Sequence, residues 1–167
     1  MKTFVIKLLC ILAFGLLYSC KESDPDAIAG ISPVSAPDEL TAFFESHLPA
    51  VSNSRNTSFL FRDAQECHVI NNMEEFEMIT NVSTVLPEID FEKYTLIIGH
   101  IEKGYALYTF EKQEIYIDPD KVTLIVTLRK FSGNGEPYFV SPAITYYDFW
   151  GMYEKISGNV SMTIREI

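Results

Sequence analysis

Residues 121–129 alternate between two sets of side chains, and this two-residue period is the feature that most restricts the fold. Successive side chains of a strand point to opposite faces of a sheet, so the segment predicts a strand with one buried and one more exposed face. A helix would instead repeat its apolar residues every three or four positions. The two sets are Val122, Leu124, Val126 and Leu128 on the buried side, and Thr123, Ile125, Thr127 and Arg129 on the other.

Other segments also carry strand-forming residues. Tyr94–Ile101 is apolar on both faces, which is typical of a central strand. Asp118–Lys121 begins with Asp and Pro, the residues favoured at the first two positions of a tight turn, so its flanking strands are predicted to be antiparallel neighbours. Ser132–Pro137 is predicted to be a longer turn. The remaining predicted strands are Ser58–Arg62, Cys67–Ile70, Tyr105–Phe110, Glu114–Asp118 and Asn159–Arg165.

Two short helices are predicted ahead of most of the strands. Asp38–Leu48 has apolar residues at helical spacing, acids in its first turn and Pro49 after it. In Asn72–Thr80, Asn72 can cap the helix and Glu75 stands at the capping-box position. Connections are short, and strands do not alternate with helices. The sequence therefore predicts an α+β fold: a mostly antiparallel, curled or sandwich-like β-sheet with two short helices on its N-terminal side.

Residues 1–19 have the order of a secretory signal peptide: Lys2 and Lys7 precede an apolar run at 8–17. The run is too short to cross a membrane, which takes about 20 apolar residues; a buried N-terminal helix is the alternative. The segment Leu17-Tyr18-Ser19-Cys20 resembles the lipobox of bacterial lipoproteins. This resemblance implies cleavage before Cys20, a thioether from Cys20 to diacylglycerol and an acyl chain on its new amine. Ordinary secretion with Cys20 as a free thiol is the alternative.

Residues 20–37 are predicted to be the lipidated cysteine and a flexible acidic tether, and residues 38–167 a single globular domain. Lys21–Asp26 resembles the short tag of a lysine and acids that directs lipoproteins of Bacteroidota to the outer face of the outer membrane. We therefore expect the protein in the bacterial cell envelope, at the outer membrane and facing outward. Any solvated linker could have the same acids, so a periplasmic placement stays open.

The chain is strongly acidic, with 13 Lys and Arg against 23 Asp and Glu and a formal net charge of −10. Residues 1–19 hold two of the bases and none of the acids, so the mature chain has a formal net charge of −12. Nucleic-acid binding is not expected, because no cluster of basic residues could neutralise a phosphate backbone. We expect the N-terminus to be attached to the membrane, which is its expected partner, through acyl chains and not through charge.

No catalytic or metal-binding motif stands out in the predicted domain. His47 and His100 are interpreted as packed histidines, each with one hydrogen-bond partner. Cys67 is interpreted as an inert thiol, because it and its neighbour His68 would point to opposite faces of a strand. No CxxC, HExxH or phosphate-binding glycine motif occurs. We therefore predict no enzyme, no metal and no cofactor beyond the covalent lipid. A cleft with two carboxylates near His68 or His100 would indicate an enzyme.

Residues 146–153 hold five aromatic side chains around Gly151. In one interpretation these rings close the end of the core. In the other, alternate rings face outward and form a contact patch for a protein or a glycan, since rigid aromatic residues dominate binding hot spots. Alternation along a strand puts Tyr147 and Phe149 opposite Tyr146 and Trp150, so both interpretations can hold in part. The candidate binding residues are Tyr146, Tyr147, Phe149, Trp150 and Tyr153.

The segment from Val69 to Ile167 resembles the C-terminal domain of PrcB-type proteins, components of a bacterial envelope protease complex, and small lipoproteins of Bacteroidota. Val69–Phe76, Leu86–Phe91 and Tyr94–Gly99 carry the resemblance. It implies a compact, β-rich and non-catalytic envelope domain. We therefore expect an anchored interaction or accessory module for another envelope macromolecule. A surface glycan- or small-ligand-binding module using the aromatic segment is the alternative, and an envelope hydrolase comes third.

Overall fold

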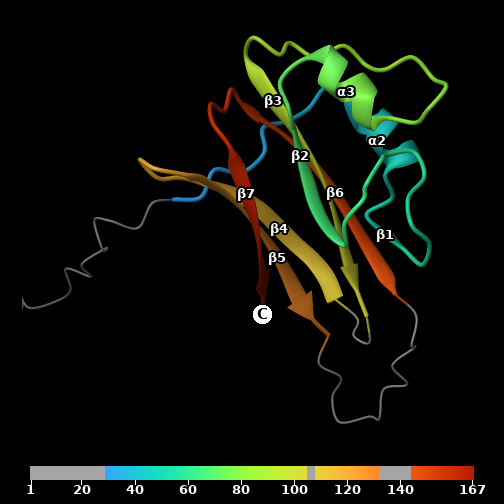
Figure 1. Cartoon of the computed structure of the whole chain (residues 1–167), viewed down its shortest axis with the longest axis vertical. Coiled ribbons are helices and arrows are strands. Elements are labelled where there is room, and N and C mark those ends of the chain that lie inside the picture. The colour runs from blue at the N-terminus through green and yellow to red at the C-terminus, as the bar shows by residue number, and fades with distance from the viewer. Residues whose placement is uncertain (1–28, 105–107, 132–143) are drawn as a thin grey trace, which may run out of the picture.

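A computed structural model describes residues 29–104, 108–131 and 144–167 of the chain. These residues form two β-sheets packed face to face, with two short helices covering the outer face of one of them (Figure 1). The predicted α+β, mostly antiparallel and sandwich-like fold is confirmed. The sandwich is not closed into a barrel.

The first sheet has four antiparallel strands in the order β1-β6-β3-β2. Their bounds are Val51–Ser52 for β1, Gln65–Ile70 for β2, Tyr94–Lys103 for β3 and Thr145–Glu154 for β6. The second sheet has the order β4-β5-β7, with bounds Tyr108–Ile117, Val122–Lys130 and Val160–Glu166. Strand β4 is antiparallel to β5, whereas β7 runs parallel to it.

Strand β3 separates two hydrophobic cores, as its apolar residues on both faces predict. Leu96 and Ile98 belong to the core beneath the helices, whereas Ile97 and Ile101 belong to the core between the sheets. All four side chains are fully buried. The four-stranded sheet is therefore covered on both faces, which explains why its central strand has no polar side.

The two helices are α2, Asp38–His47, and α3, Met73–Ile79. Both match their predictions. At the start of α3 the side-chain oxygen of Asn72 accepts a hydrogen bond from the Glu75 N–H at 2.8 Å, and the Glu75 carboxylate accepts one from the Asn71 N–H at 2.6 Å. These two bonds satisfy orphan backbone donors and fix where the helix begins.

Several predicted elements differ from the structure. Ser58–Arg62 makes only an isolated bridge between Phe59 and Thr80, and is not a strand. The two strands predicted within 105–118 are one strand, β4, with a bulge between Phe110 and Lys112 that breaks the register. Ser132–Pro137 and the start of the predicted strand at Tyr105 lie outside the described residues.

The end of the predicted flexible tether belongs to the domain. Ile31 exchanges two backbone hydrogen bonds of 2.8 Å with Ile115 of β4, and the Val34 N–H donates to the Met152 carbonyl of β6 at 2.7 Å. Because β4 and β6 are in different sheets, the segment from 31 to 34 crosses the open side of the sandwich. Ile31 and Val34, which were predicted to belong to the tether, therefore have edge partners on both sheets.

Candidate functional site

The aromatic segment forms most of strand β6, and its residues divide between the two faces of the first sheet. Tyr147, Phe149 and Tyr153 point into the core between the sheets and are at most 4% exposed. These three rings are therefore not at the described surface, because they pack in the core between the two sheets. For them the core interpretation holds.

Tyr146 and Trp150 lie on the other face of β6 and are half-buried. Trp150 stacks on Phe44 of α2, with ring centroids 4.3 Å apart, and Tyr146 stacks on His100 at 5.6 Å. These two residues are the part of the predicted patch that a partner or ligand could still reach.

A buried histidine–carboxylate pair lies on the same face of the sheet. His100 of β3 and Asp148 of β6 are cross-strand neighbours, and His100 Nδ1 lies 2.6 Å from Asp148 Oδ1. His100 Nε2 lies 3.4 Å from Glu102 Oε1. The rings of Phe61 and Tyr146 stack against the imidazole. His100 was expected to have one hydrogen-bond partner; it has two carboxylates within reach.

This pair has the composition of an acid–base dyad but not its accessibility. The side chains of His100 and Asp148 are both fully shielded from solvent. A general base must come within hydrogen-bond distance of the proton it takes from a substrate. In the described geometry the pair holds neighbouring strands together and has no open path to a substrate.

A second acid–histidine contact lies beside it on β2. Glu66 Oε1 is 3.1 Å from His68 Nε2, and Glu66 Oε2 accepts hydrogen bonds from the N–H groups of Arg62 and Asp63 at 2.6 and 3.0 Å. Partial burial acts to raise the pKa of Glu66, but the two N–H groups outweigh it and the pKa is lowered. The carboxylate therefore holds the loop before β2 through the two N–H groups and stays ionised.

His47, the third histidine, lies on α2, and its Nε2 is 3.4 Å from the Thr84 hydroxyl.

Cys67 lies on the opposite face of β2 from His68, as predicted, and packs against the core between the sheets. Burial, and then the negative charge of Glu66, raises the pKa of the Cys67 thiol to about 11. The reactive thiolate is therefore scarce at neutral pH. A nucleophilic Cys67–His68 pair does not form.

A cavity of about 350 Å³ opens at the exposed edge of β6. Strand β1 pairs with Tyr146 and Tyr147, and the Ala50 carbonyl before it accepts a hydrogen bond from the Asp148 N–H at 3.2 Å. The next strand-like contact along this edge is Val34 with Met152, so the edge between Asp148 and Met152 is not covered by another strand. There the walls come from the C-terminal part of α2, from β4 and from β6. The lining residues are Phe44, Glu45, Leu48, Pro49, Ala50, Phe110, Gln113, Asp148, Phe149 and Trp150.

Gln113 crosses from β4 to this edge and donates from Nε2 to the Trp150 carbonyl oxygen. Gly151 makes that approach feasible, because an added Cβ would lie 2.6 Å from Gln113 Nε2 and 2.9 Å from Pro33. Sequence reasoning missed Gln113, since no local pattern shows that a residue of one sheet reaches the backbone of the other.

The helix layer is the most acidic part of the described surface. Residues 38–48 and 72–93 hold nine acids and one lysine, Lys93, which is paired with Asp90 at 2.6 Å. Two grooves with mixed polar and apolar linings flank the loop after α3. One, of about 600 Å³, lies between α3 and the loop, and the other, of about 350 Å³, lies between α2 and the loop. The acids are Asp38, Glu39, Glu45, Glu74, Glu75, Glu77, Glu88, Asp90 and Glu92.

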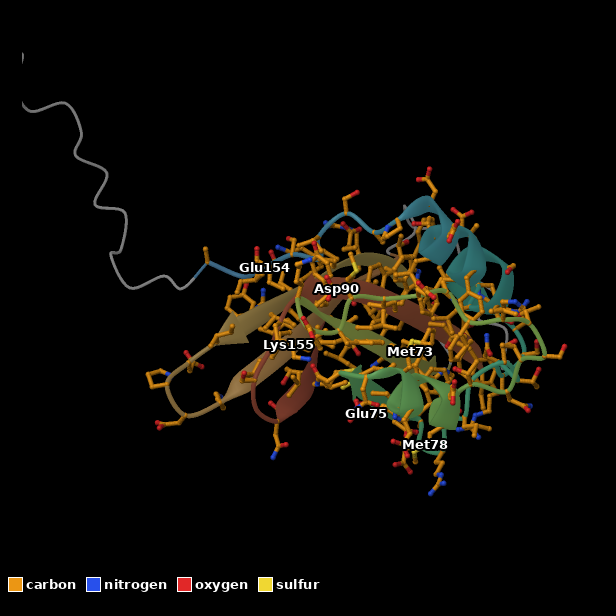
Figure 2. The ribbon with its side chains drawn as sticks, turned by 90° about the horizontal axis from the view of Figure 1, so that it is seen from above. Met73, Glu75, Met78, Asp90, Glu154 and Lys155 are labelled. Atoms are coloured by element: carbon orange, nitrogen blue, oxygen red, sulfur yellow. The ribbon has the colours of Figure 1, made fainter. Side chains whose placement is uncertain are left out.

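Large apolar side chains remain exposed around these grooves. Val85, which lines both grooves, is 94% exposed, and Met78 on α3 is 70% exposed. Figure 2 shows Met78 pointing away from the sheets. The grooves are rimmed by Glu39, Glu77 and Glu88, and none of the described residues lining them is basic.

Cys20, the predicted lipid attachment site, lies outside the described residues. Within the described ranges no helix is long and apolar enough to span a membrane. Over those same ranges, no group of three or more His, Cys, Asp or Glu side chains is arranged to hold a metal ion.

The fold and its surfaces define an α+β sandwich with a shielded histidine–carboxylate pair, an edge cavity and an acidic helix layer. Comparison with protein-family models, with curated proteins and with solved structures finds no match. The resemblance to PrcB-type domains therefore stays a prediction.

Proposed function

We propose that this chain is a lipid-anchored protein of the bacterial outer membrane, facing outward, whose domain is a non-catalytic interaction module for another envelope protein. The N-terminal segment ending at Cys20 supports the anchor. The shielded His100–Asp148 pair and the raised pKa of Cys67 support a role without catalysis.

The acidic, grooved helix layer is the observation that carries the interaction role. Exposed apolar side chains such as Val85 and Met78 gain free energy when a partner covers them, by about 25 cal/mol for each Å² of apolar surface removed from water. Isolated exposed apolar residues are common, but Val85 lines two grooves whose charged lining residues are all acidic. The partner that fits is an amphipathic protein segment with basic residues beside its apolar ones.

The position of this layer suits a tethered protein. Figure 1 shows both helices on the side of the molecule away from the point where the described chain begins, near β4. A tether running from residue 29 to the membrane would leave the helix layer directed outward. Its acids would also be repelled by anionic lipids and would keep clear of the headgroups.

Photo-crosslinking in the native envelope tests this role. A photoreactive amino acid at Val85 is expected to give an adduct with a specific protein, and the partner peptide identified by mass spectrometry is expected to be basic and amphipathic. Asp120 in the exposed β4–β5 turn is the matched control site and should give no such adduct. Replacing Glu77 and Glu88 together by Lys should remove the Val85 adduct. An adduct that persists in the Glu77→Lys, Glu88→Lys variant would contradict the charge argument.

The alternative of a small-ligand-binding module is favoured by one observation. Of the predicted aromatic residues, Phe149 and Trp150 line the cavity at the β6 edge. This cavity, where the aromatic segment meets α2 and β4, is lined by other residues than the helix-layer grooves and would be the site of such a ligand.

A further inference from the structure

The two open sides of the sandwich differ in how their strand edges are paired. On one side, β4 pairs with Ile31, and the edge formed by β1 and β6 pairs with Val34. On the other side, β2 and β7 end their sheets, and among the described residues no strand or bridge lies beyond either of them. An unpaired edge offers a row of backbone N–H and C=O groups to any extended chain that reaches it.

Strand β7 directs alternate backbone groups away from its neighbour β5. The N–H of Ile167, just after β7, donates to the Leu128 carbonyl at 3.0 Å, and the Ile167 carbonyl accepts from the Lys130 N–H at 2.8 Å. Backbone groups alternate in direction along a strand, so the odd-numbered residues face β5 and the even-numbered ones face outward. The residues with outward backbone groups are Val160, Met162, Ile164 and Glu166.

The core between the sheets is incompletely covered on this side. Val160, Met162 and Ile164 of β7 and Cys67 and Val69 of β2 pack against that core, yet all five side chains are only half-buried. Strands β2 and β7 approach each other across the opening. A strand added beside β7 would continue the second sheet and place alternate side chains over these apolar groups, which would remove them from water.

Strand β7 also lacks the features that usually keep an edge strand from pairing. Residues 160–164 contain no proline and no charged side chain, and the ladder of β7 with β5 has no bulge. The other free edge, β2, differs because Glu66 and His68 lie in its central part and contact each other at 3.1 Å. The edge of β7 is therefore the better template for a further strand.

We propose that the outer edge of β7 binds an extended segment of another protein by antiparallel strand addition. The segment has apolar residues at alternate positions, which face the core, and polar residues between them. The outer face of β7 consists of Ser161, Thr163 and Arg165, so its single charge is positive and favours an acidic residue opposite Arg165. A second copy of the chain is disfavoured as the occupant, because each chain has a formal net charge of −10.

Fluorescence anisotropy of a labelled synthetic peptide tests the proposal. The probe is the heptapeptide amide Glu-Val-Thr-Val-Thr-Val-Thr, whose valines face the core and whose glutamate lies beside Arg165 in an antiparallel pairing with β7. Full-length protein in mild detergent is expected to bind it saturably. Methylating the three valine nitrogens, which face β7, should weaken binding at least about tenfold, whereas methylating the three threonine nitrogens, which face away, should leave it nearly unchanged. No saturable binding up to about 1 mM, or equal binding of the two methylated peptides, would overturn the proposal.

Variants of Met162 locate the binding on β7. Met162→Pro removes an outward N–H that β5 does not use and places the proline ring where the peptide would pair, so binding should weaken at least about tenfold. Met162→Ala is the matched control, because it loses the same side chain but keeps the N–H, and it should bind within about threefold of the original protein. If Met162→Pro fails to fold, which circular dichroism would reveal, Met162→Lys blocks the edge with an inward-directed charge instead.

The remaining outcomes separate this edge from other sites. The Glu77→Lys, Glu88→Lys variant should bind the peptide like the original protein, because its changes lie on the helix layer over the first sheet. Unchanged peptide binding in a folded Met162→Pro or Met162→Lys protein would place the peptide elsewhere and would refute the site. A dimer in analytical ultracentrifugation that Met162→Pro converts to a monomer would show that a second copy occupies the edge, and would also overturn the proposal.

Discussion

Gly99 in the middle of β3 is expected to be intolerant of even one added methyl group. A Cβ built there lies 2.0, 2.5 and 2.6 Å from three carbon atoms of the Phe149 ring, whereas ordinary contacts are 3.4–4 Å. The ring would have to move by more than 1 Å. It is 4% exposed and is packed against the second sheet, so it has little room to do so.

The magnitude follows from two opposed effects. Alanine in place of glycine within a strand gains about 0.5–1 kcal/mol from lower backbone entropy in the unfolded chain. Overpacking of a close-packed core costs about 1–3 kcal/mol and occasionally more, and an overlap at 2.0 Å belongs at the upper end. We therefore expect Gly99→Ala to lower the free energy of unfolding by about 2 kcal/mol, and the melting temperature by several degrees.

Urea unfolding followed by Trp150 fluorescence measures this free energy. Gly104→Ala is the matched control, because a Cβ at Gly104 meets nothing within 4 Å, and it should change the free energy by less than about 0.5 kcal/mol. Phe149→Leu should relieve the overlap, so the double variant should be more stable than the sum of the single effects predicts, by about 1 kcal/mol. If Gly99→Ala were no worse than Gly104→Ala, Phe149 would not be packed between the sheets as described.

Three further predictions concern the charged loop, the thiol and the anchor. Glu66 has a lowered pKa in the folded protein, so its stabilisation is present above its unfolded pKa and is lost as the pH falls through the folded value. Glu66→Gln should lower the free energy of unfolding by about 1–2 kcal/mol at pH 7, and in urea melts this difference from the original protein should shrink as the pH falls below 4.5. A pH-independent difference would contradict this assignment. Native Cys67 should react with iodoacetamide at pH 8 far more slowly than the urea-unfolded chain, as mass spectrometry of the alkylated Cys67 peptide would show, and equal rates would refute its burial. Cys20→Ala should move the protein to the soluble fraction, whereas unchanged membrane fractionation would refute the lipid anchor.

Local patterns in the sequence were sufficient for the elements whose neighbours are close along the chain. The alternation in β5 correctly placed Val122, Leu124, Val126 and Leu128 in the core, because a side-chain period of two needs no knowledge of the partner strand. The start of α3 was likewise predictable, since Asn72 and Glu75 satisfy backbone groups within a few residues.

Features that depend on the pairing of distant strands could not be predicted. The pattern of β7 identified its apolar face but not its parallel partner, β5. His100 and Asp148 are 48 residues apart in sequence and meet only through the register of β3 with β6. Alternation along the aromatic segment correctly separates Tyr147 and Phe149 from Tyr146 and Trp150. It does not show what covers each set, because both faces of the first sheet are covered and neither set is fully exposed.

The attachment of residues 31–34 also determines how the domain would respond to a pulling force. If Cys20 is anchored in lipid, a load on the domain reaches the edge bonds of Ile31 with Ile115 first, and then the bond of Val34 with Met152. Those contacts lie one after the other along the chain, so they would open in turn while both sheets stay intact. Opening them would lengthen the predicted tether from the ten residues 21–30, about 35 Å at full extension, to the 17 residues 21–37, about 60 Å. Under load, the tether would therefore lengthen before any strand of the sandwich unfolds.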